Sequence, residues 1–211
     1  MYSFNRRRFV KASIVSSFLA LFSKDSLAGT VTPPEIEGPF YPLTPQKDMD
    51  FDLTSVIGRE GTAQGQVVFI EGQVVDQNSN PVEDATVDIW QANAAGRYRH
   101  PHDTNPAPLD PDFQGWAIVQ SGKQGKFKFK TIVPGAYPVN KDWTRPPHIH
   151  FKVSKRGYSE LTTQMYFPAN ELNSTDILLQ AKSKNEQQLM IARTVSESPF
   201  TLEYIITLGS A

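Results

Sequence analysis

The sequence predicts an all-β protein, a β-sandwich with long functional loops and an N-terminal extended arm. Short apolar stretches that alternate with polar residues recur along the chain and are separated by turn-forming residues, a pattern typical of strands. The chain also has sixteen prolines in 211 residues, and proline disrupts helices because it lacks the amide hydrogen that a helix needs. We therefore expect one sandwich domain with its functional loops gathered at one end.

The composition excludes several classes of function. The formal net charge is −1, and no basic run lies outside the N-terminus, which argues against a nucleic-acid surface. The chain contains no cysteine, so it has no disulfides, thiolate metal sites or cysteine nucleophiles. Any metal must be held by nitrogen and oxygen atoms.

Residues 1–28 have the pattern of an export signal. Three arginines at 6–8 precede an apolar run at 12–22, and small residues precede an expected cleavage point after Ala28. The apolar run is too short for a membrane-spanning helix. The arginine pattern resembles the twin-arginine type of signal, with an ordinary Sec signal as the alternative. We expect a periplasmic or secreted protein that uses the twin-arginine export machinery.

The rest of the chain divides into an arm, expected over residues 29–65, and the sandwich, expected over 66–211. The arm is too rich in proline for regular structure and should lie on the domain or on a partner subunit. A long loop is expected at 91–112, and loops of this length are usually functional. One short helix is expected within 174–195. Alternating polarity predicts strands at residues 66–75, 85–90, 126–130, 148–153, 161–167 and 201–208.

The expected strand at 148–153 reads HIHFKV. Residues two apart on a strand point to the same side, so His148 and His150 should project together while Ile149 and Phe151 face apolar packing. Imidazole binds iron, copper, nickel and zinc. The pattern indicates a metal site, and its alternative is two unrelated histidines near a sheet edge.

Two histidines do not complete a metal site, and physical chemistry leaves two further ligand sets open. His100 and His102 would give a four-histidine site for iron, copper or manganese, although a loop does not fix their direction as a strand would. Tyr98 and Tyr137 are the other set. A phenol has an ordinary pKa of about 10, so only a strongly Lewis-acidic ion such as ferric iron would hold it deprotonated at neutral pH.

Several motifs occur in the order and spacing of the intradiol ring-cleavage dioxygenases. They are IWQANAAGRYRH at 89–100, LDPDF at 109–113, PGAYP at 134–138, RPPHIHF at 145–151 and LTTQMYF at 161–167. The chain resembles this family from about residue 37 to residue 167 and more weakly beyond. Within the family it is most similar to the iron-binding (β) subunit of the protocatechuate 3,4-dioxygenases.

The resemblance implies a non-haem ferric ion, Fe(3+), held by Tyr98, Tyr137, His148 and His150. Tyr137 would be the tyrosinate that leaves when substrate binds. The chemistry implied is cleavage of a catechol-type ring by O2 between its two hydroxyl-bearing carbons, giving a cis,cis-muconate-type product.

The resemblance also implies roles outside the ligand set. Arg145, always cationic, would lie beside the ring and stabilise negative charge that develops there. Gln164 would lie just behind the ligands. His100 and His102 then become ordinary loop residues near the site.

One departure from the family leaves the substrate open. After Pro138 the protocatechuate enzymes usually carry a tryptophan, whereas this chain has Val139, followed by a shortened segment to Trp143. Protocatechuate, catechol, hydroxyquinol and larger phenols remain candidates, as do homo- and hetero-oligomers. Two readings from other classes also remain: a non-catalytic secreted β-sandwich binding module and a four-histidine metal oxidase.

Overall fold

The structure, a computed structural model, describes residues 29–44 and 48–211. The export signal expected at 1–28 lies outside the described residues, as do residues 45–47. The strands are β1 (Val67–Asp76), β2 (Thr86–Trp90), β3 (Trp116–Gln120), β4 (Lys126–Ile132), β5 (Tyr137–Asn140), β6 (Trp143–Arg145), β7 (His148–Ser154), β8 (Leu161–Tyr166), β9 (Arg193–Glu197) and β10 (Phe200–Leu208). The helices are the 3₁₀ turns η1 (Lys123–Gly125) and η2 (Glu171–Ser174) and the α-helices α1 (Ile177–Gln180) and α2 (Lys184–Met190).

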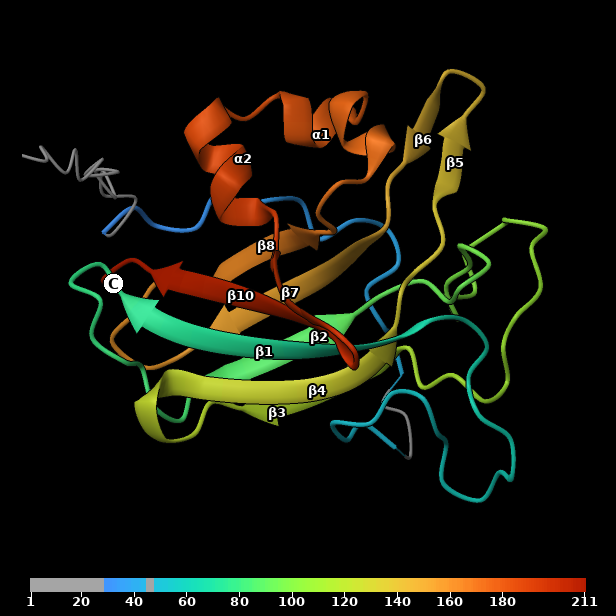
Figure 1. Cartoon of the computed structure of the whole chain (residues 1–211), viewed down its shortest axis with the longest axis horizontal. Helices are drawn as coiled ribbons and strands as arrows, with labels where there is room; N and C mark the ends of the chain where they lie inside the picture. The colour runs from blue at the N-terminus through green and yellow to red at the C-terminus, as the bar shows by residue number, and fades with distance from the viewer. Residues whose placement is uncertain (1–28, 45–47) are drawn as a thin grey trace, which may run out of the picture.

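Two four-stranded sheets form a sandwich, which confirms the predicted all-β class. The β1 sheet has the order β4-β1-β10-β9 and the β7 sheet the order β3-β2-β7-β8. β1 runs parallel to β10 and antiparallel to β4, whereas all neighbours in the β7 sheet are antiparallel. The two-stranded hairpin β5-β6 stands out from one end of the sandwich, beside α1 (Figure 1).

The core lies between the two sheets and follows the period of two in the strands. Val87 and Ile89 of β2 and Ile149 and Phe151 of β7 are fully buried in it, together with Phe129 of β4. As expected, the residues that alternate with these in β2 and β7 point to the outer face of the β7 sheet. On that face Trp90 is paired with His150.

The six expected strands are present within one or two residues of their expected ends. Four further strands, β3, β5, β6 and β9, were not expected, because each is short and lacks a clean alternation of polarity. The prediction of one short helix within 174–195 was wrong, since α1 and α2 both lie there. A new helix begins because Ser183 and Glu186 form a capping box, in which each side chain accepts a hydrogen bond from the other's backbone amide. None of the helices in the described ranges is long and apolar enough to cross a bilayer.

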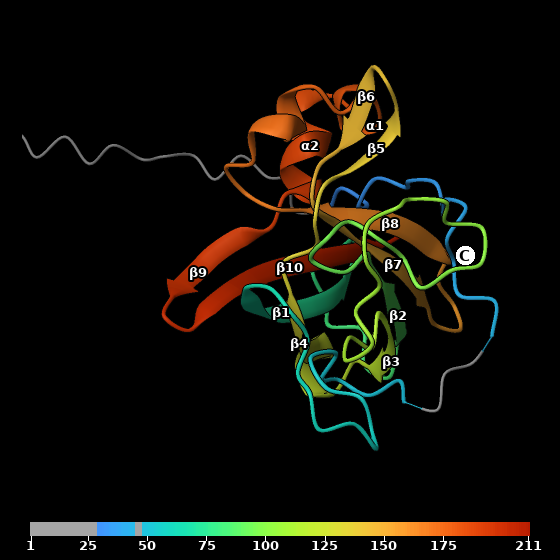
Figure 2. The same cartoon turned by 90° about the vertical axis from the view of Figure 1, so that its right-hand side faces the viewer.

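The N-terminal arm crosses the outer face of the β7 sheet (Figure 2). Its Glu35 amide donates to the Thr162 carbonyl of edge strand β8 at 2.9 Å. Glu37 then pairs with Lys152 of β7, and the Tyr41 hydroxyl donates to Asp88 of β2 at 2.6 Å. The arm therefore covers the face to which the β7 histidines point.

Two loops cross at a pair of glycines next to this face. Gly135, which precedes β5, donates its amide to the Asn93 carbonyl at 2.9 Å. A Cβ on Gly135 would lie 2.4 Å from both the Ala94 oxygen and the Gly96 nitrogen. Gly96 has φ +77° and would bring a Cβ within 2.4 Å of the Ala136 oxygen. Only glycine allows the backbones to approach this closely.

We expect Gly135→Ala to lower the free energy of unfolding by about 1–3 kcal/mol, because backbone atoms must separate to admit the methyl group. Gly122→Ala is the matched control, since its Cβ would meet only the Lys126 oxygen at 3.7 Å and its φ is −90°. Urea unfolding of both variants gives the comparison. Equal stability of the two variants would contradict the close crossing.

Candidate metal centre

The predicted histidine pair lies side by side on β7. The His148 and His150 rings are 4.9 Å apart, and both side chains are buried. β7 lies between β2 and β8 and is hydrogen-bonded on both sides, so the direction of each side chain is determined by the strand. Trp90 of β2 stacks on the His150 ring at 4.8 Å and 12°.

The two predicted tyrosines meet these histidines from separate loops. Tyr98 comes from the long loop between β2 and β3, where its backbone amide donates to Asp103 at 2.7 Å. Tyr137 is the first residue of β5. The Tyr98 oxygen lies 3.1 Å from His150 Nε2 and 3.4 Å from His148 Nε2, and the Tyr137 oxygen lies 3.4 Å from His148 Nε2. Two oxygens and two nitrogens therefore converge on one point.

The hydrogen bonds around the histidines favour lone pairs directed at this point. His148 Nδ1 lies 2.7 Å from the Pro146 carbonyl oxygen, which can only accept a hydrogen bond. Nδ1 therefore carries the proton, and Nε2 presents its lone pair to the two phenols. His150 Nδ1 is buried without a hydrogen-bond partner, whereas its Nε2 faces Tyr98.

Burial makes all four groups neutral. It raises the pKa of Tyr98 and of Tyr137 above the ordinary phenol value. It also lowers the pKa of His148 and of His150 well below the ordinary value, and the Arg145 charge lowers both further. Neutral imidazole is the form that binds metals. A trivalent cation at this point would supply the charge needed to hold the phenols as phenolates, so this donor set fits ferric iron.

The four-histidine alternative is wrong. Among the described residues, which include all four histidines, no group of three or more His, Cys, Asp or Glu side chains is placed to hold a metal. His100 instead packs against His102 at 5.2 Å and against Phe40 of the arm at 5.7 Å. The convergent set contains tyrosines in place of a second histidine pair.

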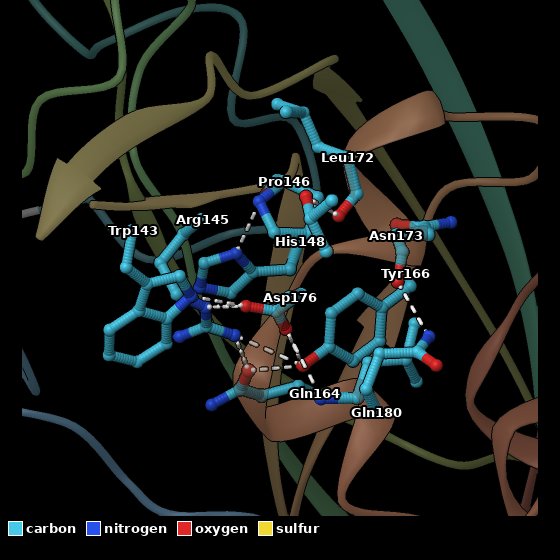
Figure 3. A network of polar contacts seen from close by, with 12 residues as sticks. Trp143, Arg145, Pro146, His148, Gln164, Tyr166, Leu172, Asn173, Asp176 and Gln180 are labelled. Atoms are coloured by element: carbon cyan, nitrogen blue, oxygen red, sulfur yellow. Dashed lines mark hydrogen bonds and ion pairs between the residues drawn. The ribbon is translucent and has the colours of Figure 1, made fainter.

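Arg145 of β6 is buried beside the centre in a polar network (Figure 3). Its Nε donates to Asp176 at 3.0 Å, and its Nη2 donates to Gln164 at 2.6 Å and to the Tyr166 hydroxyl at 3.0 Å. Gln164 of β8 in turn donates to the Ile36 carbonyl of the arm at 3.0 Å. The predicted residues Arg145 and Gln164 are thus joined directly, and both are held in place.

A cavity of about 400 Å³ opens beside the centre. Tyr137, His150 and Arg145 line it. The hairpin residue Trp143 and several arm residues, which include Phe40, form other parts of the wall. The volume is within the usual range for small-molecule sites. Of the four convergent residues, Tyr137 and His150 thus face a space into which a small molecule fits.

Sequence reasoning missed three residues of this site. Asp176 is fully buried, caps α1 and pairs with Arg145. Its signal was available, since an aspartate directly before an apolar run is a common helix start. Tyr166 and Phe40 gave no comparable signal, because aromatic residues in a strand or an arm are usually packing residues.

Comparison with known proteins agrees with this geometry. A protein-family profile described as Dioxygenase matches residues 36–208. The β chain of protocatechuate 3,4-dioxygenase from Burkholderia cepacia is 38% identical over 159 residues, which are 74% of this chain and 67% of that protein. Catechol 1,2-dioxygenase 2 from Acinetobacter lwoffii is 32% identical over 148 residues, 64% of this chain and 50% of that protein. The chain thus spans about half to two thirds of these relatives.

Two solved structures are also similar. The dioxygenase domain of a dioxygenase carbohydrate-binding protein fusion from Streptomyces sp. SirexAA-E has a TM-score of 0.65 at 27% identity, covering 86% of this chain and 99% of that chain. 3-Chlorocatechol 1,2-dioxygenase from Rhodococcus opacus 1CP has a TM-score of 0.66 at 26% identity, covering 87% and 76%. The profile matches most of the length of the chain, and the relatives named above are intradiol dioxygenases. The chain therefore belongs to the intradiol ring-cleavage dioxygenase family.

Proposed function

We propose that this chain is a non-haem ferric dioxygenase that cleaves a catechol-type ring between its two hydroxyl-bearing carbons. The observation that carries the proposal is the convergence of the Tyr98 and Tyr137 oxygens with the Nε2 atoms of His148 and His150, at 3.1–3.4 Å. Catechol and O2 combine into one dicarboxylic product, a cis,cis-muconate, so the reaction needs no external reductant. When bound, ferric iron would act as a Lewis acid that stabilises the catechol dianion and primes the ring for reaction with O2.

The positions of the two tyrosines relative to the cavity suggest a different role for each. Tyr98 is buried behind the centre, whereas Tyr137 lines the cavity. Tyr137 would therefore be the iron-holding residue that an incoming catechol replaces, and its phenolate oxygen would accept a catechol proton. Tyr98, His148 and His150 would continue to hold the iron, and their fixed positions would keep the substrate oxygens in one orientation.

Arg145 supplies positive charge next to the reacting ring. Its hydrogen bonds to Asp176, Gln164 and Tyr166 use Nε and Nη2, and the residue also lines the cavity. A guanidinium held in this way stabilises negative charge on the ring without reorganising. Gln164 positions Arg145 and also ties it to the arm.

Two further proposals concern the whole protein. The arginine-rich start of the chain supports export through the twin-arginine machinery to the periplasm or beyond. A homo- or hetero-oligomer is the other proposal, since the named relatives include a β chain. Signal cleavage is checked by N-terminal sequencing of the exported protein, and the oligomeric state by light scattering.

The first test is the absorption spectrum of the purified iron-loaded protein, before and after anaerobic addition of catechol. We expect a broad tyrosinate-to-iron band that shifts to longer wavelength with catechol. A protein that stays colourless after ferric reconstitution would contradict the proposal. It would favour the non-catalytic binding module instead.

Tyr98→Phe and His148→Ala should each lose most of the bound iron and the visible colour, because each removes a donor atom that substrate does not replace. Tyr137→Phe should keep iron while catechol binds and reacts more slowly. His102→Ala, a change at an exposed loop histidine, is the control and should keep both. Iron content by mass spectrometry decides, and full iron in Tyr98→Phe would overturn the assignment.

Iron binding should release protons and should strengthen as pH rises. The pKa of each tyrosine is raised, so both phenols are protonated at pH 7 and must lose their protons to bind the metal. The pKa of each histidine is lowered, so the imidazoles are already neutral and release none. Calorimetric titration with ferric nitrilotriacetate in buffers of different ionisation enthalpy measures the protons released. Binding that is independent of pH between 6 and 8 would contradict tyrosinate ligation.

Asp176→Asn should lower the free energy of unfolding by about 3 kcal/mol or more, because it leaves the buried Arg145 charge without its partner. Catechol turnover should fall while iron content stays high. Asp142→Asn is the control, since Asp142 is largely exposed and pairs with Lys141 at 3.6 Å, and exposed pairs contribute little. Equal stability of the two variants would mean that the buried pair has no special role.

A further inference from the structure

The cavity is larger than an unsubstituted catechol requires. Its volume is about 400 Å³, whereas catechol is one ring with two hydroxyl groups. A catechol whose oxygens lie at the tyrosines and histidines would fill the inner end only. The remaining space extends between the arm, the loop after Tyr98 and the β5-β6 hairpin, whose residues form the other walls. A ring substituent would occupy this outer part.

The charged groups of the cavity do not favour an anionic substituent. Arg145 is the only cation among the lining residues, and Asp176 already pairs with it at 3.0 Å. The other charged lining residue is Asp103, whose carboxylate accepts from the Tyr98 and Asn105 amides at 2.7 and 2.8 Å. In the outer part of the cavity a substrate carboxylate would lose hydration without gaining a cation from the described residues, which is costly.

Most of the outer lining residues are apolar instead, with Thr104 and Asn105 as the uncharged polar ones. Ile36 of the arm and Val139 of the hairpin line the cavity while remaining 55% and 49% exposed. Trp143 also lines the cavity, its ring lies 5.6 Å from the Arg145 guanidinium carbon, and its Nε1 donates to Asp176 at 3.0 Å, which fixes the indole. Partly exposed apolar side chains gathered at the mouth of a cavity indicate a surface that an apolar ligand covers. The apolar lining side chains are those of Ile36, Pro39, Phe40, Pro106, Pro138, Val139 and Trp143.

Lys141 at the hairpin tip does not change this balance. It is almost fully exposed and pairs with Asp142 at 3.6 Å. Lys152 and Lys182 are likewise engaged with the arm, through Glu37 and Glu35. These lysines lie outside the cavity lining.

We propose that the cavity selects catechols carrying an uncharged, apolar ring substituent over catechols carrying a carboxylate, with Val139 as a residue that sets this specificity. The inference rests on the proposed function of the same site. It separates this chain from what the name of its protocatechuate-cleaving relative would suggest, because the described residues that line the outer cavity include no cation to receive a carboxylate.

The test measures dissociation constants by anaerobic calorimetry on the iron-loaded protein at pH 7. The ligands are catechol, its 4-methyl, 4-ethyl and 4-propyl derivatives, and protocatechuate. Each added methylene should tighten binding by about fourfold as it becomes buried. Protocatechuate should bind at least about tenfold more weakly than 4-methylcatechol. Oxygen uptake with the same ligands should follow the same order.

Val139→Lys should reverse part of this preference. A cation on the cavity wall should tighten protocatechuate binding by roughly fivefold and weaken 4-propylcatechol binding. Val195→Lys makes the same chemical change at an exposed valine of β9, away from the cavity, and should leave both constants at their wild-type values. The wild-type series does not depend on either variant.

The outcomes separate this inference from the proposed function. Cleavage of catechol together with protocatechuate binding as tight as that of 4-propylcatechol would overturn the inference and leave the proposed function intact. Failure of every catechol to bind or react would overturn both. Tightening along the alkyl series, with a specific gain for protocatechuate in Val139→Lys, would establish the apolar outer cavity.

Discussion

Strand β7 has one face in the core between the sheets and the other on the outer side of its sheet. The arrangement of the rest of the molecule depends on this constraint. Ile149 and Phe151 point into the core between the sheets, so His148 and His150 must point to the outer face of the same sheet. An outer face is normally hydrated, yet these imidazoles are buried. The arm, the long loop after β2 and the hairpin form a second layer over this face, and together they bury the imidazoles and enclose the cavity beside them.

A buried cation, Arg145, lies in the second layer, and the residues that pair with it connect the parts of that layer. Arg145 is held by Asp176 at the start of α1, by Gln164 of β8 and by Tyr166. The partners come from β8 and from the start of α1, and Arg145 itself lies on β6, so the charge joins the hairpin, the sheet and the short helices. The same charge lowers the pKa of both histidines. A single guanidinium therefore affects both the packing of the cover and the protonation of the donors.

The sequence predicts the β7 face well because a period of two is a local property. The six expected strands and the histidine pair follow from alternation alone. The tyrosines do not, since Tyr98 and Tyr137 reach the centre through loops whose crossing at Gly96 and Gly135 depends on tertiary contact. Chemistry left them as one of two possible ligand sets, and resemblance to a family chose them over His100 and His102. The four unexpected strands were missed because their pairing depends on residues far along the chain. The position of Asp176 before an apolar run indicated a helix start, but its pairing with Arg145 depends on tertiary contact.

The arm also determines when the site can be completed during folding. Thr32 donates its amide to Thr207 of β10, the last strand of the chain, and Glu35 bonds to β8. Contacts of such long sequence separation form late, because the loops between them must close first. The earliest part of the arm to be synthesised is thus among the last to dock. A chain that has enclosed its cavity has, by the same contacts, already brought the arm at Thr32 beside strand β10.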